Sequence, residues 1–274
     1  MALMLKRLFQ SYFWAMEELS DPRALDYPLM FSPFPTIFIL FLWFKFILQW
    51  GPDYMKNREP INLKTVMMVY NIFQVAANSY IVYYVFLAKD VISLSCMEVD
   101  YSNSYWGLKF LSITYLYFML KLADLLDTIF FVLRKKTSHL SFLHIYHHFG
   151  MVCISWLAMK FIGGGHNYYV ALANAPVHII LYSYYLLTAY DSKYGKHLWL
   201  KKFITQAQLV QFAFLLLMFG QLLFNECNFP KIVPIFFIPQ NLFMMCLFGD
   251  FYIRTYIMIP KQKEKLQNKD LKKD

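Results

Sequence analysis

Long apolar runs separated by short polar linkers dominate the chain. A transmembrane helix needs about 20 mostly apolar residues. Seven stretches meet this requirement, at roughly 29–50, 64–88, 109–133, 140–160, 168–190, 203–224 and 232–258. Pro176, Pro234 and Pro239 interrupt two of them, which a membrane helix tolerates because neighbouring helices satisfy the freed backbone groups. The pattern predicts an all-α integral membrane protein with seven transmembrane helices.

The composition agrees with this pattern. Apolar residues make up 59% of the 274 positions and charged residues 16%, whereas soluble domains are about 45–50% apolar. We therefore exclude a soluble enzyme and expect a membrane catalytic domain, 29–258, between an N-terminal segment, 1–28, and a basic tail, 259–274. Glu17 and Asp21 in the first segment do not fit a cleaved signal peptide.

Lysine and arginine are unevenly divided between the linkers on the two sides of the predicted spans. Seventeen fall on the side of the C-terminus and seven on the side of the N-terminus. Since cytosolic loops are enriched in these residues, we expect a lumenal N-terminus and a cytosolic C-terminus. The net charge of +9 is then a consequence of topology. No nucleic-acid-binding module is recognisable, and we expect no nucleic-acid partner.

The stretch FLHIYHH places His144, His147 and His148 in an otherwise apolar run. Residues three and four apart share one helix face, so the three rings can converge on one substrate or metal. His139, His166 and His197, in or near linkers, are interpreted as surface residues. Ionisable groups within spans are costly and usually functional, and the sequence therefore predicts a site at the histidine cluster.

Other polar residues are predicted at overlapping depths. Taking about 1.5 Å per helical residue, His147 lies roughly 16 Å and His178 roughly 20 Å from the cytosolic rim, and Asp127 roughly 10 Å. The stretch KLADLLD also contains Lys121 and Asp124, whose i, i+3 spacing equally fits an ion pair that only neutralises itself. The depths predict a buried reaction chamber open to the cytosol.

Two further stretches add polar side chains to these layers. NAPVHIILY places Asn174, His178 and Tyr182 on one helix face, and TQAQLVQF contributes Gln208 and Gln211. Hydrogen bonds between membrane helices explain such residues equally well, and both interpretations stay open.

The four stretches together resemble a known family. LHIYHH, with KLADLLDTIFFVLRKK before it and NAPVHIILYSYY and TQAQLVQF after it, is similar in order and spacing to the ELO family of very-long-chain fatty acid elongases. The resemblance implies a seven-helix membrane protein of the endoplasmic reticulum in which six helices form a barrel around a narrow substrate tunnel. It also implies a 3-oxoacyl-CoA synthase, an acyltransferase that joins long-chain acyl-CoA to malonyl-CoA with loss of CO2. No cofactor is expected, and other enzymes of the elongation cycle are expected partners.

The residues can be assigned roles in that reaction. Imidazole forms covalent intermediates, and we hypothesise that His147 accepts the acyl chain, a choice that depends on the resemblance. A direct condensation in which a histidine is only a base stays open. The remaining candidates for proton handling, orientation and oxyanion stabilisation are His178, His148, His144, Asn174, Gln208, Tyr182, Lys121, Asp124 and Asp127.

Charged and sulfur-containing residues near the membrane surfaces complete the expected site. The CoA phosphates are expected at the basic rim, where the candidates are Arg134, Lys136, Lys201, Lys202 and Arg254; ordinary positive-inside flanks are the alternative. Cys96 and Cys227 fall in lumenal linkers, where a disulfide can form, and two free thiols are the alternative.

Two rival classes were weighed. A di-metal desaturase or hydroxylase also uses an H-x-x-H-H box, but such enzymes resemble one another in having several boxes, and this chain has seven histidines and a single box. A seven-span receptor or transporter fits the number of spans but gives no reason for clustered intramembrane histidines. We therefore expect no metal site.

Overall fold

The computed structural model describes residues 2–258, and all regular secondary structure in that range is helical. The all-α prediction is confirmed there, while the predicted basic tail, 259–274, lies outside the described residues. The α-helices in this range are α1 (Ala2–Glu17), α2 (Phe34–Lys45), α3 (Gly51–Met55), α4 (Lys64–Leu87), α5 (Tyr105–Leu133), α6 (Phe142–Phe161), α7 (Tyr168–Tyr190), α8 (Leu198–Gly220) and α9 (Ile232–Ile253).

Four helical stretches are long and apolar enough to cross a membrane. They are Phe34–Met55, Gly165–Tyr190, Leu198–Leu223 and Ile232–Met258. In the first, the π-helical turn Phe46–Trp50 joins α2 to α3 without a break. The helices α4, α5 and α6 occupy the other three predicted spans, and that these also cross the membrane stays a prediction.

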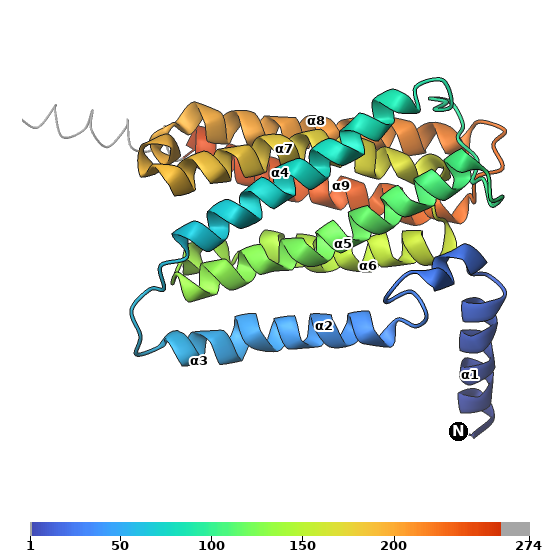
Figure 1. The fold of residues 1–274 in the computed structure, drawn as a ribbon, viewed down its shortest axis with the longest axis horizontal. Coiled ribbons are helices and arrows are strands. Elements are labelled where there is room, and N and C mark those ends of the chain that lie inside the picture. The colour runs from blue at the N-terminus through green and yellow to red at the C-terminus, as the bar shows by residue number, and fades with distance from the viewer. Residues whose placement is uncertain (1, 259–274) are drawn as a thin grey trace, which may run out of the picture. The chain divides into compact units, whose positions relative to one another are not determined.

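The chain divides into two compact units. The first contains the residues up to Thr65 and Tyr84–Ala171, and the second contains Val66–Tyr83 and the residues from Leu172 onward. In the first unit α5 and α6 pack side by side (Figure 1). The Trp43 indole donates to the Leu125 carbonyl at 3.0 Å, which attaches α2 to α5.

In the second unit α8 packs along α9. The Asn241 amide on α9 donates to the Phe212 carbonyl on α8 at 2.8 Å. Farther along, the rings of Phe219 and Phe237 stack with centroids 4.1 Å apart. An interhelical hydrogen bond and aromatic packing therefore both hold this pair together.

The connection between α6 and α7 is buried, which corrects one expectation. Gly164 and Gly165 have φ of 121° and 55°, values that favour glycine. A Cβ on Gly165 would meet the Val99 side chain at 2.8 Å, so the segment around Val99 covers the turn. The interpretation of His166 as a surface residue is wrong, because this covering leaves His166 0% exposed.

Candidate active site

The three clustered histidines lie on the first two turns of α6. Ser141 begins this helix, with its hydroxyl accepting from the His144 backbone N–H, which satisfies one of the free donors of the first turn. The ring centroids of His144 and His148 are 4.2 Å apart, and those of His147 and His148 are 5.7 Å apart. All three side chains are half-buried, and the local geometry brings the rings together as the spacing predicts.

The neighbouring helix α5 supplies a contact to this cluster. Thr128 Oγ1 lies 2.8 Å from His144 Nε2. Thr128 itself is fully buried, so its hydroxyl is held in place by packing. This hydrogen bond restricts the rotation of the His144 ring and thereby positions the ring that His148 contacts.

Lys121 and Asp124 form a buried ion pair on α5. The Lys121 Nζ–Asp124 Oδ2 distance is 2.8 Å, and the side chains are 2% and 4% exposed. The Lys121 ammonium also lies 4.8 Å from the centre of the Tyr117 ring. The helix that carries this pair packs along α6, which carries His147. Asp127, one turn further along α5, is half-buried.

In the second unit, the predicted stripe on α7 is buried. Asn174, His178 and Tyr182 are 4%, 8% and 1% exposed. The Asn174 amide donates to the Gln211 side-chain oxygen of α8 at 3.4 Å. Gln208 lies one turn before Gln211 and is half-buried. The interhelical hydrogen bond anticipated as an alternative for these stretches is therefore present at Gln211.

A polar stripe on α4 extends this network and was missed in the sequence. The hydroxyls of Tyr70 and Tyr182 are 3.3 Å apart. Gln74 Nε2 donates to the Tyr70 hydroxyl at 2.9 Å, and Asn78 Nδ2 donates to the Gln74 carbonyl at 2.8 Å. The i, i+4, i+8 spacing of Tyr70, Gln74 and Asn78 is the signal that could have identified the stripe.

His147 belongs to the first unit and His178 to the second. Each lies among the polar residues of its own unit. Their convergence on one chamber stays a prediction.

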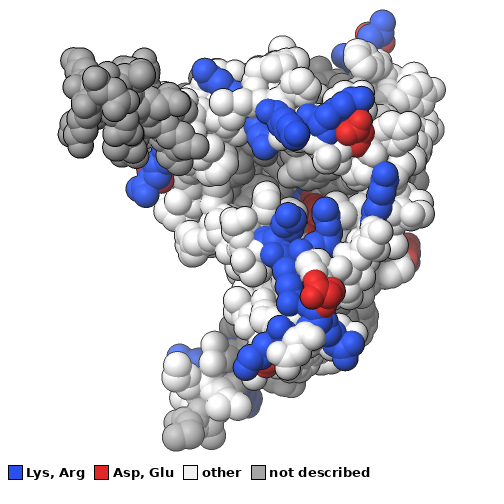
Figure 2. Space-filling model, turned by 90° about the vertical axis from the view of Figure 1, so that its left-hand side faces the viewer, with Lys and Arg blue, Asp and Glu red and all other residues white. Residues whose placement is uncertain are grey.

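The basic candidates lie at helix ends. In the view of Figure 2, lysine and arginine side chains are common and acidic side chains are few. Lys136, Lys201, Lys202 and Arg254 are exposed, and Arg134 is half-buried. Arg254 Nε donates to Asp250 Oδ1 at 2.7 Å, so a phosphate at Arg254 would compete with this carboxylate.

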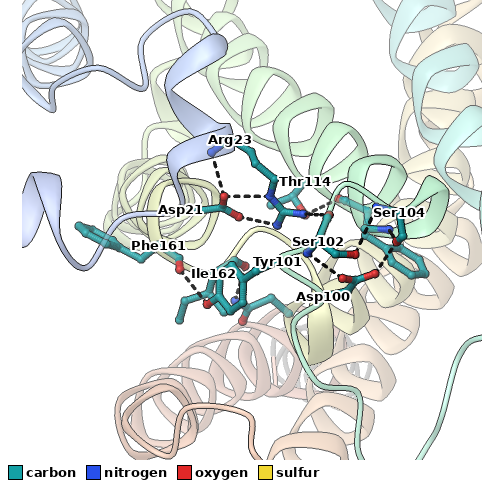
Figure 3. Close-up of polar contacts among 12 residues, drawn as sticks. Asp21, Arg23, Asp100, Tyr101, Ser102, Ser104, Thr114, Phe161 and Ile162 are labelled. Carbon is teal, nitrogen blue, oxygen red and sulfur yellow. Dashed lines mark hydrogen bonds and ion pairs between the residues drawn. The ribbon is translucent and has the colours of Figure 1, made fainter.

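A second polar cluster, the N-terminal polar cluster, consists of Asp21, Arg23, Asp100, Ser102 and Ser104 (Figure 3). Arg23 donates to both oxygens of Asp21, at 3.0 and 2.7 Å, and to the Ser102 carbonyl at 2.6 Å. The hydrogen bond with Asp21 raises the pKa of Arg23. Hydrogen bonds from Ser102 and Ser104 lower the pKa of Asp100. The cluster ties the segment after α1 to the loop before α5.

The cysteines fall into two classes. Cys153 and Cys246, which lie in predicted spans, carry free thiols, and the other two cysteines are not among the free thiols. That Cys96 and Cys227 are bonded to each other stays a prediction. Within residues 2–258, no group of three or more histidine, cysteine, aspartate or glutamate side chains is arranged to hold a metal ion.

Comparison with known proteins gives consistent matches along the chain. The family model described as ELO, GNS1/SUR4 family, matches residues 28–265. Very long chain fatty acid elongase 4 of Mus musculus is 39% identical over 93% of this chain and 81% of its own length. Elongase 7 of Rattus norvegicus is 38% identical over 92% of both chains. A very long chain fatty acid elongase of Aedes aegypti is 37% identical over 93% of this chain and 72% of its own length.

Proposed function

Because the chain belongs to the GNS1/SUR4 family, we propose that it catalyses the condensing step of fatty acid elongation. A long-chain acyl-CoA and malonyl-CoA would give a 3-oxoacyl-CoA two carbons longer, with release of CO2 and one CoA. The observation that carries the proposal is the cluster of three adjoining, half-buried imidazoles on α6. The very long chain fatty acid elongases that match over most of their length support it.

The protein is a multi-pass membrane protein, because four of its helices are long and apolar enough to cross a membrane. We place it in the endoplasmic reticulum with a lumenal N-terminus and a cytosolic C-terminus. In this arrangement α4, α5 and α6 also cross the membrane, giving seven spans, six of which enclose the acyl tunnel. The charge asymmetry of the linkers supports this orientation.

In the proposed mechanism, a nitrogen of His147 attacks the acyl thioester carbon, which forms an acyl-imidazole and expels the first CoA as its thiolate. A neighbouring imidazole of the cluster takes the proton that the acylated His147 ring loses from its other nitrogen and passes it to the thiolate. Malonyl-CoA then loses CO2, and the carbanion that remains attacks the acyl-imidazole carbonyl. The bond to His147 breaks, the departing ring takes up one proton from water through the neighbouring imidazole, and the 3-oxoacyl-CoA leaves. These steps need only the two CoA substrates, with no cofactor and no metal ion. Metal analysis of the active protein tests this expectation.

The other polar residues would act around this centre. Lys121 and Asp124 neutralise each other in one buried ion pair, and we assign them to positioning, through the charges that they present to His147. Asp127 joins them on the same helix. Asn174, Gln208, Tyr182 and His178 would orient the second substrate or its thioester oxygen.

The CoA moieties would stay at the membrane surface. Arg134, Lys136, Lys201, Lys202 and Arg254 are the proposed phosphate ligands, with arginine favoured because its planar fork contacts two phosphate oxygens. We further propose that Cys96 and Cys227 form one disulfide. The other enzymes of the elongation cycle are the proposed protein partners.

Two measurements test the proposal. The first is release of labelled CO2 from malonyl-CoA that depends on added acyl-CoA, compared among wild type, His147→Ala and the control His197→Ala. His197 is exposed, outside the cluster. We expect the first variant alone to lose activity; equal activity in both variants would refute the role of His147. The second is mass spectrometry of protein incubated with acyl-CoA alone. An acyl adduct on His147 is expected, and its absence under turnover conditions would favour direct condensation.

A further inference from the structure

The first helix, α1, is amphipathic. With 3.6 residues per turn, Met4, Leu5, Leu8 and Phe9 fall on one face. Lys6, Arg7 and Gln10 fall on the opposite side. An amphipathic helix of this kind is stable where its apolar face meets an apolar environment and its other side meets a polar one.

The apolar face of α1 is covered along only part of its length. Toward the C-terminal end, Tyr12 contacts Phe34, with ring centroids 5.9 Å apart, and Met16 packs against the core of the first unit. Toward the N-terminal end, Leu5, Leu8 and Phe9 are 65%, 61% and 65% exposed. The same face therefore passes from a protein-covered half to an uncovered half.

The covered end of α1 meets the chain where a membrane span begins. Phe34 is the first residue of Phe34–Met55, one of the four candidate spans. Within the first unit, Figure 1 shows α1 running crosswise to α2. A helix of 16 residues is about 24 Å long, shorter than the hydrocarbon core of about 30 Å. The direction and the length both indicate a helix that lies along the membrane surface.

We propose that α1 is an interfacial helix that binds the phospholipid surface at the side of the membrane where α2 begins. Met4, Leu5, Leu8 and Phe9 enter the boundary between headgroups and acyl chains, as the apolar faces of interfacial helices do. Lys6 and Arg7 extend toward the lipid phosphates, with their aliphatic stems along the apolar surface.

The composition of the chain's own tail argues against the tail as the occupant of this face. The tail 259–274 contains six lysines and only three strongly apolar residues, Ile259, Leu266 and Leu271, too few to cover the face.

Labelling of the full chain tests the proposal. An environment-sensitive fluorophore is attached to Leu8→Cys or Gln10→Cys in a background with Cys153→Ser and Cys246→Ser. Residues two apart lie on nearly opposite faces of a helix, so Gln10 is the matched control. Each protein is placed at one copy per nanodisc of phosphatidylcholine and phosphatidylserine. The label is quenched with nitroxide-bearing lipid or with aqueous iodide, and acyl-CoA-dependent CO2 release verifies the fold.

The label at Leu8 should be quenched several-fold more by the lipid-borne quencher than the label at Gln10, with the opposite order for iodide. Equal quenching of both labels by iodide would show a helix in water and overturn the proposal. Shielding of the Leu8 label from both quenchers would show that protein covers the face, which also overturns it. As an independent test, Leu8→Asp should increase iodide quenching of a label at Leu5→Cys, whereas the matched change Gln10→Asp should not.

Discussion

Replacing Lys121 with methionine removes the ammonium that lies 2.8 Å from the buried Asp124 carboxylate. Breaking a buried pair by removing one partner costs about 3–5 kcal/mol. At roughly 2–4 °C per kcal/mol for a chain near this size, the apparent unfolding midpoint should fall by roughly 6–20 °C. Asp124→Leu should destabilise the protein by a similar amount, because it leaves the Lys121 ammonium buried.

The double variant, Lys121→Met with Asp124→Leu, separates two roles of the pair. Apolar residues of similar volume often replace a buried ion pair without loss of stability, so the midpoint should return to within a few degrees of wild type. The charges that we propose to act on His147 are absent in this variant. We therefore expect kcat for CO2 release to stay low although the protein is again stable.

Both quantities are measured on purified protein in nanodiscs, with thermal unfolding followed by intrinsic fluorescence and turnover assayed well below the lowest midpoint. Lys193→Met is the matched control, since Lys193 forms its 2.9 Å ion pair with Asp191 in an exposed position, where such pairs contribute little. Single variants as stable as this control would refute the energetic reasoning. A double variant that regains full turnover would show that the pair only neutralises itself.

Three further predictions concern single contacts. Arg23→Met leaves the fully buried Asp21 carboxylate without its guanidinium and should cost about 3–5 kcal/mol, measured as the unfolding midpoint, with turnover per folded molecule unchanged. Asp100 has a pKa below its ordinary 3.8, so it stabilises the fold above pH 3.8 and loses this contribution as the pH falls through the lower folded-state value. In Asp100→Asn the unfolding midpoint should therefore depend less steeply on pH in this acidic range. An unchanged slope of midpoint against pH would contradict the assignment. Tyr182→Phe removes the hydrogen bond to Tyr70 and should lower the free energy of unfolding by about 0.5–1.5 kcal/mol. Adding Tyr70→Phe should not remove the stability of this contact a second time.

The positions of the helices were largely predictable because span length and linker polarity are local properties of the sequence. The predicted span 168–190 coincides with α7. The predicted span 29–50 is observed as Phe34–Met55, because the helix continues past Gly51 through a π-helical turn. A Cβ on Gly51 would meet the Val132 side chain of α5 at 2.6 Å. This glycine therefore permits a close helix contact, whereas the sequence alone suggested a helix end.

The polar residues were predictable to the extent that their partners are local. The Lys121–Asp124 pair follows from i, i+3 spacing. The burial of Lys160 and His166, both 0% exposed, depends on segments distant in sequence. The backbone N–H of Asp21 donates to the Lys160 carbonyl at 3.0 Å, which places the chain after α1 over the end of α6. The hydrophobic periodicity of α6 does not indicate that a distant segment covers its end.

The polar residues differ in their capacity to act as a nucleophile. Lys121 and Asp124 satisfy each other within one turn of α5, and the Lys121 ammonium has no lone pair with which to attack a thioester carbon. The imidazoles of α6 are half-buried and adjoin one another, so a ring nitrogen can be reached while neighbouring rings exchange protons. A covalent intermediate requires such an accessible nucleophile. The buried charges can then change the rate only through the histidines, and loss of the histidines should abolish the acyl adduct in a protein whose ion pair is intact.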